Sequence, residues 1–368
     1  MRLHVVKRDS CPLWKMLLLY VGAVAAALLL GAVLLLALGV NPMEYYSKMF
    51  TMGMVGNKIA YKAFENYLKV FVPLVLTAVG LSLAFKMRFW NIGGEGQFIV
   101  GAIVAAVVAF KAGAVLPGAV TLLLMCLAAM AAAGAYGAIA AALKVRFGTN
   151  ETLPTLMLNY IALYALIFLG ETKAEWNFLL NPESARPTFG SFASLASFPG
   201  ISIGKFNLNV CVILTFVIGV LVFIYLKYTK HGYEIAVVGE SRRTASYAGI
   251  KVDRVIIRTM ALSGALCGLI GLLLTSSTDH TMTTTIVDGR GFTAVMVSWM
   301  AKFNPIIMIF VSLLLVVLNR GAGEISTAFG LNRSFADILT GIILFFIIGC
   351  EFFINYKVQF RTSGKKEA

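Results

Sequence analysis

The sequence predicts an all-α, polytopic membrane protein with about ten transmembrane helices. Hydrophobic residues make up 59% of the chain and charged residues 13%, and the mean hydropathy is +0.86. A soluble domain carries roughly a quarter charged residues. Several apolar runs reach the length of about 18 residues that crosses the hydrocarbon layer of a bilayer. Because these runs are continuous rather than alternating, they predict helices and exclude a membrane β-barrel.

Eight of the apolar runs are long enough to be transmembrane spans on their own. The first is too long for the hydrophobic region of a cleavable signal peptide, and it lacks an obvious cleavage site. The fourth is rich in alanine and glycine, which favours close packing of helices. The expected spans are 16–40, 67–85, 92–111, 115–143, 151–170, 208–226, 258–276 and 336–354.

Two further apolar runs, 291–301 and 305–318, are each too short to cross a bilayer, and the stretch 302–305 interrupts them. Broken runs are typical of discontinuous or re-entrant helices, which must lie against protein rather than lipid. Together with these runs the chain has ten expected membrane segments. The mixed segment 41–66 is expected to be extracytoplasmic, with a helix lying on the membrane surface.

The distribution of Lys and Arg predicts which ends of the spans face the cytoplasm. With the N-terminus inside, the cytoplasmic side carries 20 of the 31 Lys and Arg residues. We therefore expect a cytoplasmic tail 1–15 and a cytoplasmic tail 357–368 on either side of a transmembrane domain 16–356. The Pro-, Gly- and Ser-rich segment 171–207 is then extracytoplasmic, and the loop 228–257 is cytoplasmic.

Composition and motif searches exclude several functions. The net charge is +14, but the charges are scattered through short loops, and no zinc, RNP or basic-zipper pattern indicates nucleic-acid binding. The five cysteines have no CxxC spacing, and four lie in apolar runs, so they indicate core residues rather than disulfides or a metal site. There is no HExxH, GxSxG or GxxxxGK[ST] motif, so neither a catalytic site nor nucleotide hydrolysis is predicted in this chain.

The loop 228–257 is the longest markedly polar, basic segment between apolar runs. Within it, Ser241 can cap a short helix from Arg242 to Ala248, which Gly249 then closes. The small side chains of Ala245 and Ala248 would allow a partner surface to approach closely, while the arginines would meet acidic groups or phospholipid. A short rigid helix suits force transmission. The alternative interpretation is a solvated connecting loop whose basic residues only reflect the general excess of Lys and Arg on the cytoplasmic side.

Polar side chains at membrane depth are costly, and their default interpretation is functional. Asn91, Glu95 and Gln97 lie among three glycines that weaken the helix and free backbone groups for a polar ligand or a water-filled route. The alternative is a turn at the cytoplasmic end with a solvated Glu95. Asn150 is a good N-cap, and Glu151 would lie in the positive field at the start of the next helix. Asn159 lies deeper, where it suits an interhelical hydrogen bond as well as a ligand contact.

Four motifs resemble those of permease subunits in ABC importers for sugars, branched-chain amino acids and nucleosides, and they occur in the family's order. The first resembles the FNIGAEGQ signature, and the second is similar to the TLMLNYIA segment of the nucleoside-importing branch. The loop 228–257 resembles the family's RAVGxNxxAAxYAGI segment. The matching stretches are GLSLAFKMRFWNIGGEGQFIVGA (80–102), GTNETLPTLMLNYIAL (148–163), the loop from Gly232 to Ile250, and GRGFTAVMVSWMAKFNPI (289–306); residues 338–346 also resemble the family's closing segment.

The chain departs from the family pattern at several positions. Gly94 stands where the family usually has Ala, and Ser241 where it has Asn. Leu153 and Pro154 replace the usual pair before the TLMLNYIA segment. Trp299-Met300-Ala301 replaces a small, Gly-containing stretch. These departures bear on the shape of the pathway, so they concern the substrate more than the family.

The resemblance implies a type II importer permease fold without chemistry of its own, in the bacterial cytoplasmic (inner) membrane and in contact with its lipid. Two homologous, non-identical permeases would pair, and two ATPase subunits, or one fused ATPase, would bind ATP-Mg in the cytoplasm. A substrate-binding lipoprotein would deliver nucleosides from outside. Alternatives are a sugar (ribose-like) or branched-chain amino-acid permease, or an ion-coupled secondary transporter. No metal, cofactor or nucleic acid is expected on this chain.

The resemblance also assigns roles to individual residues. Coupling to the ATPase falls on the short helix of the cytoplasmic loop, and support or lining of the translocation pathway falls on polar residues near the span ends. The coupling set is Glu240, Ser241, Arg242, Arg243, Thr244, Ala245, Tyr247, Ala248, Gly249 and Ile250, and the pathway set is Asn91, Glu95, Gln97, Asn150, Glu151 and Asn159.

Overall fold

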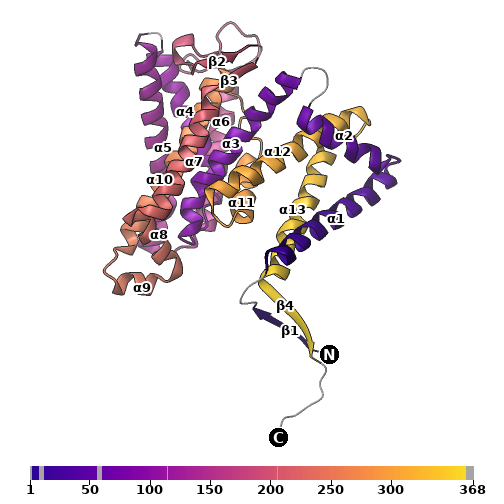
Figure 1. Cartoon of the computed structure of the whole chain (residues 1–368). Coiled ribbons are helices and arrows are strands. Elements are labelled where there is room, and N and C mark those ends of the chain that lie inside the picture. Colours follow the sequence, from indigo (N-terminus) through magenta and orange to yellow (C-terminus); the bar gives the residue numbers. More distant parts are fainter. Residues whose placement is uncertain (1, 8–11, 56–59, 114, 205, 362–368) are drawn as a thin grey trace. The chain divides into compact units, whose positions relative to one another are not determined.

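The computed structural model describes residues 2–7, 12–55, 60–113, 115–204 and 206–361. The chain divides into two compact units, one of residues 1–63 and 314–368 and one of residues 64–313. The helices in order are α1 (Leu13–Ala37), α2 (Pro42–Val55), α3 (Ala60–Lys86), α4 (Gly94–Ala112), α5 (Gly118–Phe147), α6 (Thr152–Glu171), α7 (Val210–Tyr228), α8 (Lys230–Glu240), α9 (Arg242–Tyr247), α10 (Val252–Leu273), α11 (Arg290–Met300), α12 (Pro305–Ala328) and α13 (Arg333–Asn355). The strands are β1 (Arg2–Lys7), β2 (Gly200–Ile203), β3 (Phe206–Asn209) and β4 (Tyr356–Arg361) (Figure 1).

Nine helices within the described ranges are long and apolar enough to cross a membrane, which confirms the all-α, polytopic fold. The tenth expected segment forms the short helix α11 of 11 residues. It ends in a tight turn in which Lys302 and Phe303 both have positive φ, at 49° and 60°. After this break α12 runs to Ala328, ten residues beyond its expected end at 318. The prediction that this run is too short to cross a membrane is wrong, because its stretch Pro305–Gly323 is long and apolar enough.

The core of the larger unit is the packing of α10 against α4 and α5. Glycines allow these backbones to meet, because a Cβ on Gly101 of α4 would lie 2.3 Å from Gly268 Cα of α10. A Cβ on Gly264 would lie 2.4 Å from the carbonyl oxygen of Ala133 in α5, and one on Gly271 would lie 2.3 Å from that of Phe98. The alanine- and glycine-rich composition of the fourth span is therefore used as predicted, for close helix packing.

The smaller unit is built around α1, α2, α13 and the last turns of α12. Tyr45 of α2 is buried, and its hydroxyl lies 3.3 Å from Ser326 Oγ. The Tyr46 hydroxyl donates to the carbonyl oxygen of Leu28 in α1 at 2.7 Å. Ala23 of α1 packs against Cys350 and Ile354 of α13. The segment 41–66, expected to hold a helix, thus contributes α2 to a packed core.

Both short sheets lie in segments that were expected to be tails or loops. β1 and β4 pair antiparallel, from Arg2 opposite Arg361 to Lys7 opposite Tyr356, so residues 2–7 and 357–361 of the expected tails form strands. β2 and β3 pair antiparallel at the end of the segment 171–207 and continue to Asn209, two residues into the expected span 208–226. In the larger unit this hairpin lies at the end of the bundle opposite to α8 and α9 (Figure 1).

We predict that Gly101→Val destabilises the protein by about 3 kcal/mol or more, because the added side chain overpacks two backbones that cannot separate without moving whole helices. The matched control is Gly22→Val on α1, where a Cβ meets nothing within 4 Å and the change is expected to stay within about 1 kcal/mol. The thermal unfolding midpoint of the detergent-purified protein measures both. Equal losses in the two variants would contradict the packing argument.

Candidate functional site

The segment from Thr229 to Gly249 folds into two capped helices, as its sequence dictates. The Thr229 side chain accepts a hydrogen bond from Gly232 N at 3.1 Å and begins α8. Ser241 likewise accepts from Thr244 N at 3.3 Å and begins α9. Gly249 ends the segment with a φ of +76°, a conformation that glycine adopts without strain. The predicted short helix after Ser241 is confirmed, and it ends at Tyr247 rather than Ala248.

Helix α8 is fixed to the bundle at two places. A Cβ on Gly239 would lie 2.3 Å from the carbonyl oxygen of Lys86, so only glycine lets α8 reach the end of α3. Arg258 of α10 forms an ion pair with Glu234 of α8 at 3.0 Å. Ile235 and Val238 are buried on the same helix. Helix α8 is therefore held against both α3 and α10.

Helix α9, in contrast, is almost entirely exposed. Tyr247 is 91% exposed, and most of the expected coupling residues share this exposure. Ala245 differs from the expectation, because its side chain is buried and fixes α9 to the chain instead of offering a surface. Exposed members of the set are Glu240, Arg242, Arg243, Thr244, Tyr247, Ala248 and Gly249, while Ser241 and Ile250 are half-buried.

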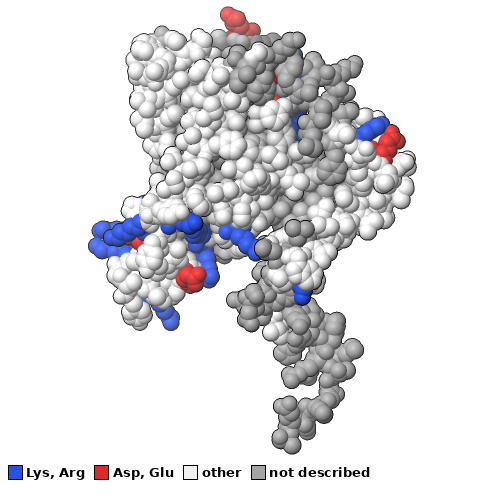
Figure 2. Space-filling model, in the orientation of Figure 1, with Lys and Arg blue, Asp and Glu red and all other residues white. Residues whose placement is uncertain are grey.

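Positive charge gathers around this helix. Figure 2 shows Lys and Arg over the end of the larger unit that carries α8 and α9, while the middle of the visible face of this unit is almost free of charged residues among those described. Arg242, Arg243, Lys251 and Arg254 are exposed, and none of them forms an ion pair within the described parts of the chain. The projecting surface suits an anionic partner, either acidic side chains or lipid phosphate.

The polar residues of the segment 91–97 are hydrogen-bonded inside the bundle. Asn91 is fully buried, and its Nδ2 donates to Gln97 Oε1 and to Ser263 Oγ, both at 3.2 Å. Asn159 of α6 accepts from Gly96 N at 2.7 Å and donates to the carbonyl oxygen of Ile92 at 2.8 Å. Of the two roles that the sequence left open, these contacts favour structural support of the segment over lining of an open route.

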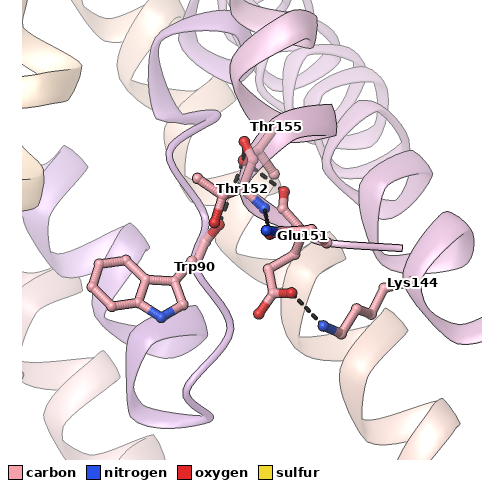
Figure 3. A network of polar contacts seen from close by, with 6 residues as sticks. Trp90, Lys144, Glu151, Thr152 and Thr155 are labelled. Carbon is pink, nitrogen blue, oxygen red and sulfur yellow. Dashed lines mark hydrogen bonds and ion pairs between the residues drawn. The ribbon is translucent and has the colours of Figure 1, made fainter. Parts of the chain in front are cut away.

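The start of α6 is tied to the end of α5 by an ion pair between Glu151 and Lys144 (Figure 3). Their side chains are only 10% and 18% exposed. Burial raises the pKa of Glu151, but the hydrogen bond and charge of Lys144 outweigh it, so the pKa of this carboxyl lies below its usual range. The Thr155 hydroxyl lies 3.4 Å from the carbonyl oxygen of Trp90, which connects the same corner to the segment before α4.

The helix cap at this corner differs from the expectation. Asn150 was expected to be the N-cap of α6, but Glu151 occupies that position. Asn150 is exposed and accepts from Thr152 N at 3.0 Å, so it satisfies a free N–H group of the first turn from one residue further out.

Glu95 is half-buried, whereas most of the other expected pathway residues are buried. Its side chain packs against the backbone of Gly291 at the start of α11, and its Oε1 atom is buried without a hydrogen-bond partner in the described parts of the chain. A Cβ on Gly291 would lie 2.1 Å from Glu95 Cγ, so glycine is required for this approach. The contact joins α4 to the short helix α11, and a carboxylate is favoured at that helix terminus.

Two groups of aromatic residues lie outside the expected site residues, although Tyr160 had been interpreted, like Asn159, as a residue for an interhelical hydrogen bond or a ligand contact. Trp90 and Trp299 stack with ring centroids 4.9 Å apart and lie at the end of the bundle near Phe85. On α6, Tyr160 and Tyr164 are 48% and 64% exposed although they lie near the middle of the helix. The only available signals were the bulky Trp299 in an otherwise small-residue motif and a four-residue tyrosine spacing, which places both rings on one helix face.

The fold, with its apolar helices and its projecting basic helix, defines a multi-pass membrane protein of the cell membrane. Residues 63–348 match the family described as branched-chain amino acid transport system / permease component, and the chain belongs to this family. A glucose ABC transporter permease of Haloferax volcanii is 28% identical over 97% of this chain and 93% of its own. Two guanosine ABC transporter permeases of Bacillus subtilis are similar as well. One is 27% identical over 92% of this chain and 93% of its own, and the other is 29% identical over 64% and 73%.

We predict that Glu151→Gln destabilises the protein by about 3 kcal/mol at neutral pH, because it leaves the Lys144 ammonium partly buried without a counter-charge. The lowered pKa means that this stabilisation is present above the ordinary carboxyl pKa and is lost as pH falls through the lowered value. The difference between wild type and variant should therefore shrink below about pH 4. Thermal unfolding midpoints of the wild type and the variant, recorded across this pH range, measure the stability difference.

Glu44→Gln is the matched control for this prediction. Glu44 pairs with Lys48 at 2.6 Å, but the two side chains are 51% and 48% exposed. Its loss is expected to be below about 1 kcal/mol. If Glu151→Gln proves no more harmful than Glu44→Gln, the Lys144 pair does not hold α5 and α6 together.

Proposed function

We propose that this chain is the permease subunit of an ABC importer that moves nucleosides inward across the cytoplasmic membrane, with separate ATPase subunits engaging α9. The observation that carries the proposal is α9 itself, a capped, exposed and basic helix that projects from one end of a membrane bundle. Such a helix has no role in the packing of its own unit beyond Ala245. It is suited to contact a partner.

Force applied to α9 has a direct route into the membrane helices. Four residues, Ala248 to Lys251, connect α9 to α10. On its other side α9 follows α8 at Ser241, and the Gly239 contact and the Arg258–Glu234 pair hold α8 against α3 and α10. When ATP-Mg binds to the partner ATPases and closes them, a push on residues 240–250 would tilt these helices and change the access to the pathway. This chain contributes no catalytic residue to that cycle.

The exposed face of α6 supports a second permease subunit as partner. A tyrosine hydroxyl near the middle of a span is costly against lipid, because no hydrogen-bond partner is available there. Tyr160 and Tyr164 are therefore expected to face protein or a water-filled route. Two similar permeases of one bacterium, Bacillus subtilis, are consistent with pairs of homologous subunits. The pathway then lies along α6, with Asn91, Gln97 and Asn159 as support behind it.

A nucleoside is the proposed substrate because the TLMLNYIA segment and the guanosine permease relatives agree. A substrate-binding lipoprotein would deliver it from outside. Glucose is the second candidate, because the glucose permease relative covers 97% of this chain. The lipoprotein selects the solute in either case, so the permease itself is expected to bind it weakly.

We predict that Ala248→Trp uncouples ATP hydrolysis from transport, because the added ring keeps the ATPase surface from seating on α9. The uptake rate of the complete transporter should fall below about a tenth of the wild-type rate. This corresponds to a shift of at least tenfold in the equilibrium between complexes with the ATPase seated on α9 and complexes without it. The ATPase activity should lose its stimulation by substrate. Ala37→Trp, at the exposed end of α1, is the matched control and should change neither quantity. Full uptake with a stimulated ATPase in Ala248→Trp would refute the coupling role.

The substrate proposal is tested by uptake of radiolabelled guanosine into vesicles that contain the full complex, with and without ATP. We expect guanosine uptake to require ATP. Other nucleosides should compete with guanosine, whereas glucose and leucine should not. Uptake of labelled glucose under the same conditions would support the second candidate and leave the permease assignment intact. Uptake without ATP would contradict the importer mechanism.

A further inference from the structure

A cavity of about 190 Å³ lies in the larger unit at the end of the bundle opposite to α9. Its walls come from the N-terminal half of α3, the first turn of α7, the turn that follows α10, and the segment around β2 and β3. The residues that matter for its chemistry are Leu68, Lys69, Phe198, Val212, Thr278 and His280. None of them belongs to the coupling or pathway sets described above.

The wall formed by the end of α10 has an unusual backbone. Residues Leu274–Asp279 form a π-helical turn, a feature that often marks functional positions in helices. His280 follows it with a φ of 50°, a left-handed conformation that non-glycine residues rarely adopt. Strained positions of this kind persist where the surrounding structure holds them.

Hydrogen bonds hold the strained wall in place. Asn209 and Ser277 are bonded to each other through their side chains, and Asn209 Oδ1 also accepts from Cys211 N at 3.0 Å. His280 Nδ1 lies 3.1 Å from Ser197 Oγ, and its carbonyl oxygen accepts from Phe192 N at 2.9 Å. The cavity is therefore a rigid, preformed site rather than a gap between loose segments.

The lining of the cavity combines apolar and polar groups. Leu68, Val212 and the ring of Phe198 are apolar. The Lys69 ammonium, the Thr278 hydroxyl and His280 Nε2 line the same cavity and have no hydrogen-bond partner within the described ranges. Glu65 also lines the cavity, so acidic and basic groups are balanced and an uncharged ligand is favoured over an ion.

The volume restricts the ligand to one small ring. Pockets for drug-sized ligands start at about 300 Å³, so a complete nucleoside would not be enclosed. A monosaccharide ring fits, because its C–H groups suit Leu68, Val212 and Phe198 and its hydroxyl groups suit Lys69, Thr278 and His280.

We propose that this cavity binds the sugar ring of the transported solute, the ribose of a nucleoside or a free hexose such as glucose. The identity of the solute that carries this ring rests on the proposed function, because both candidate substrates contain a sugar ring. The bound ring would hold the solute at the end of the bundle that receives it, before it passes to the route along α6.

Saturation-transfer NMR on the purified full-length chain tests the site without ATP or partner subunits. The probes are ribose, glucose and guanosine, with leucine as a solute that has no sugar ring. We expect saturation transfer to the ring protons of at least one sugar and none to leucine. Saturation transfer to ribose and guanosine but not to glucose would indicate that the cavity binds the ribose of a nucleoside. Saturation transfer to glucose alone would indicate that it binds a free hexose. No transfer to any sugar would overturn the proposal.

Two variants locate the binding. Lys69→Met and Thr278→Val each remove one free polar group from the cavity and should weaken sugar binding about ten-fold, as expected for one hydrogen bond. Lys111→Met is the control, because Lys111 lies over the Phe178 ring at 5.0 Å and does not line this cavity. Unchanged binding in both cavity variants, with unfolding midpoints like that of wild type, would place the sugar elsewhere. Such a result would leave the permease assignment untouched.

Discussion

The close approach of backbones among α4, α5 and α10 is the constraint on which the larger unit depends. Lipid is as apolar as leucine, so the hydrophobic effect does not draw helices together inside a bilayer. Dispersion contacts and hydrogen bonds must do so, and they require short distances. Gly101, Gly264, Gly268 and Gly271 provide those distances, because each stands where a Cβ would collide with a neighbouring backbone or alanine. The rest of the unit is arranged around this rigid centre.

The roles of the buried polar residues near the start of α4 also follow from the lack of hydrogen-bond partners in lipid. Where backbone leaves the helical pattern before α4, its groups cannot be left to lipid, so neighbouring helices supply partners. Asn159 and Thr155 reach this segment from α6, and Ser263 reaches it from α10. Most of the residues predicted to contact the solute are thus used to satisfy the chain itself. The exposed tyrosines of α6 are the polar groups for which we propose a partner outside the unit.

Helix α10 connects the two ends at which function is proposed. With its π-turn it runs from Val252 to Asp279, 28 residues and therefore about 40 Å. One end joins α9 through a short link, and the other forms the wall of the polar cavity with Ser277 and Thr278. Because α10 is also packed into the centre of the bundle, a tilt at the α9 end moves the cavity wall as well. The proposed ATPase contact and the proposed sugar site are in this way mechanically linked.

The sequence by itself determined the all-α membrane fold, the break before α12 and the short helix after Ser241. Each of these depends on local properties: apolar run length, capping side chains and a glycine with positive φ. Only the tertiary structure decided that Ala245 is buried, that Glu151 pairs with Lys144, and that Asn91 is bonded to Ser263. The last two residues are separated by 172 positions. The cavity was equally beyond the sequence, because its walls come from segments that only helix packing brings together.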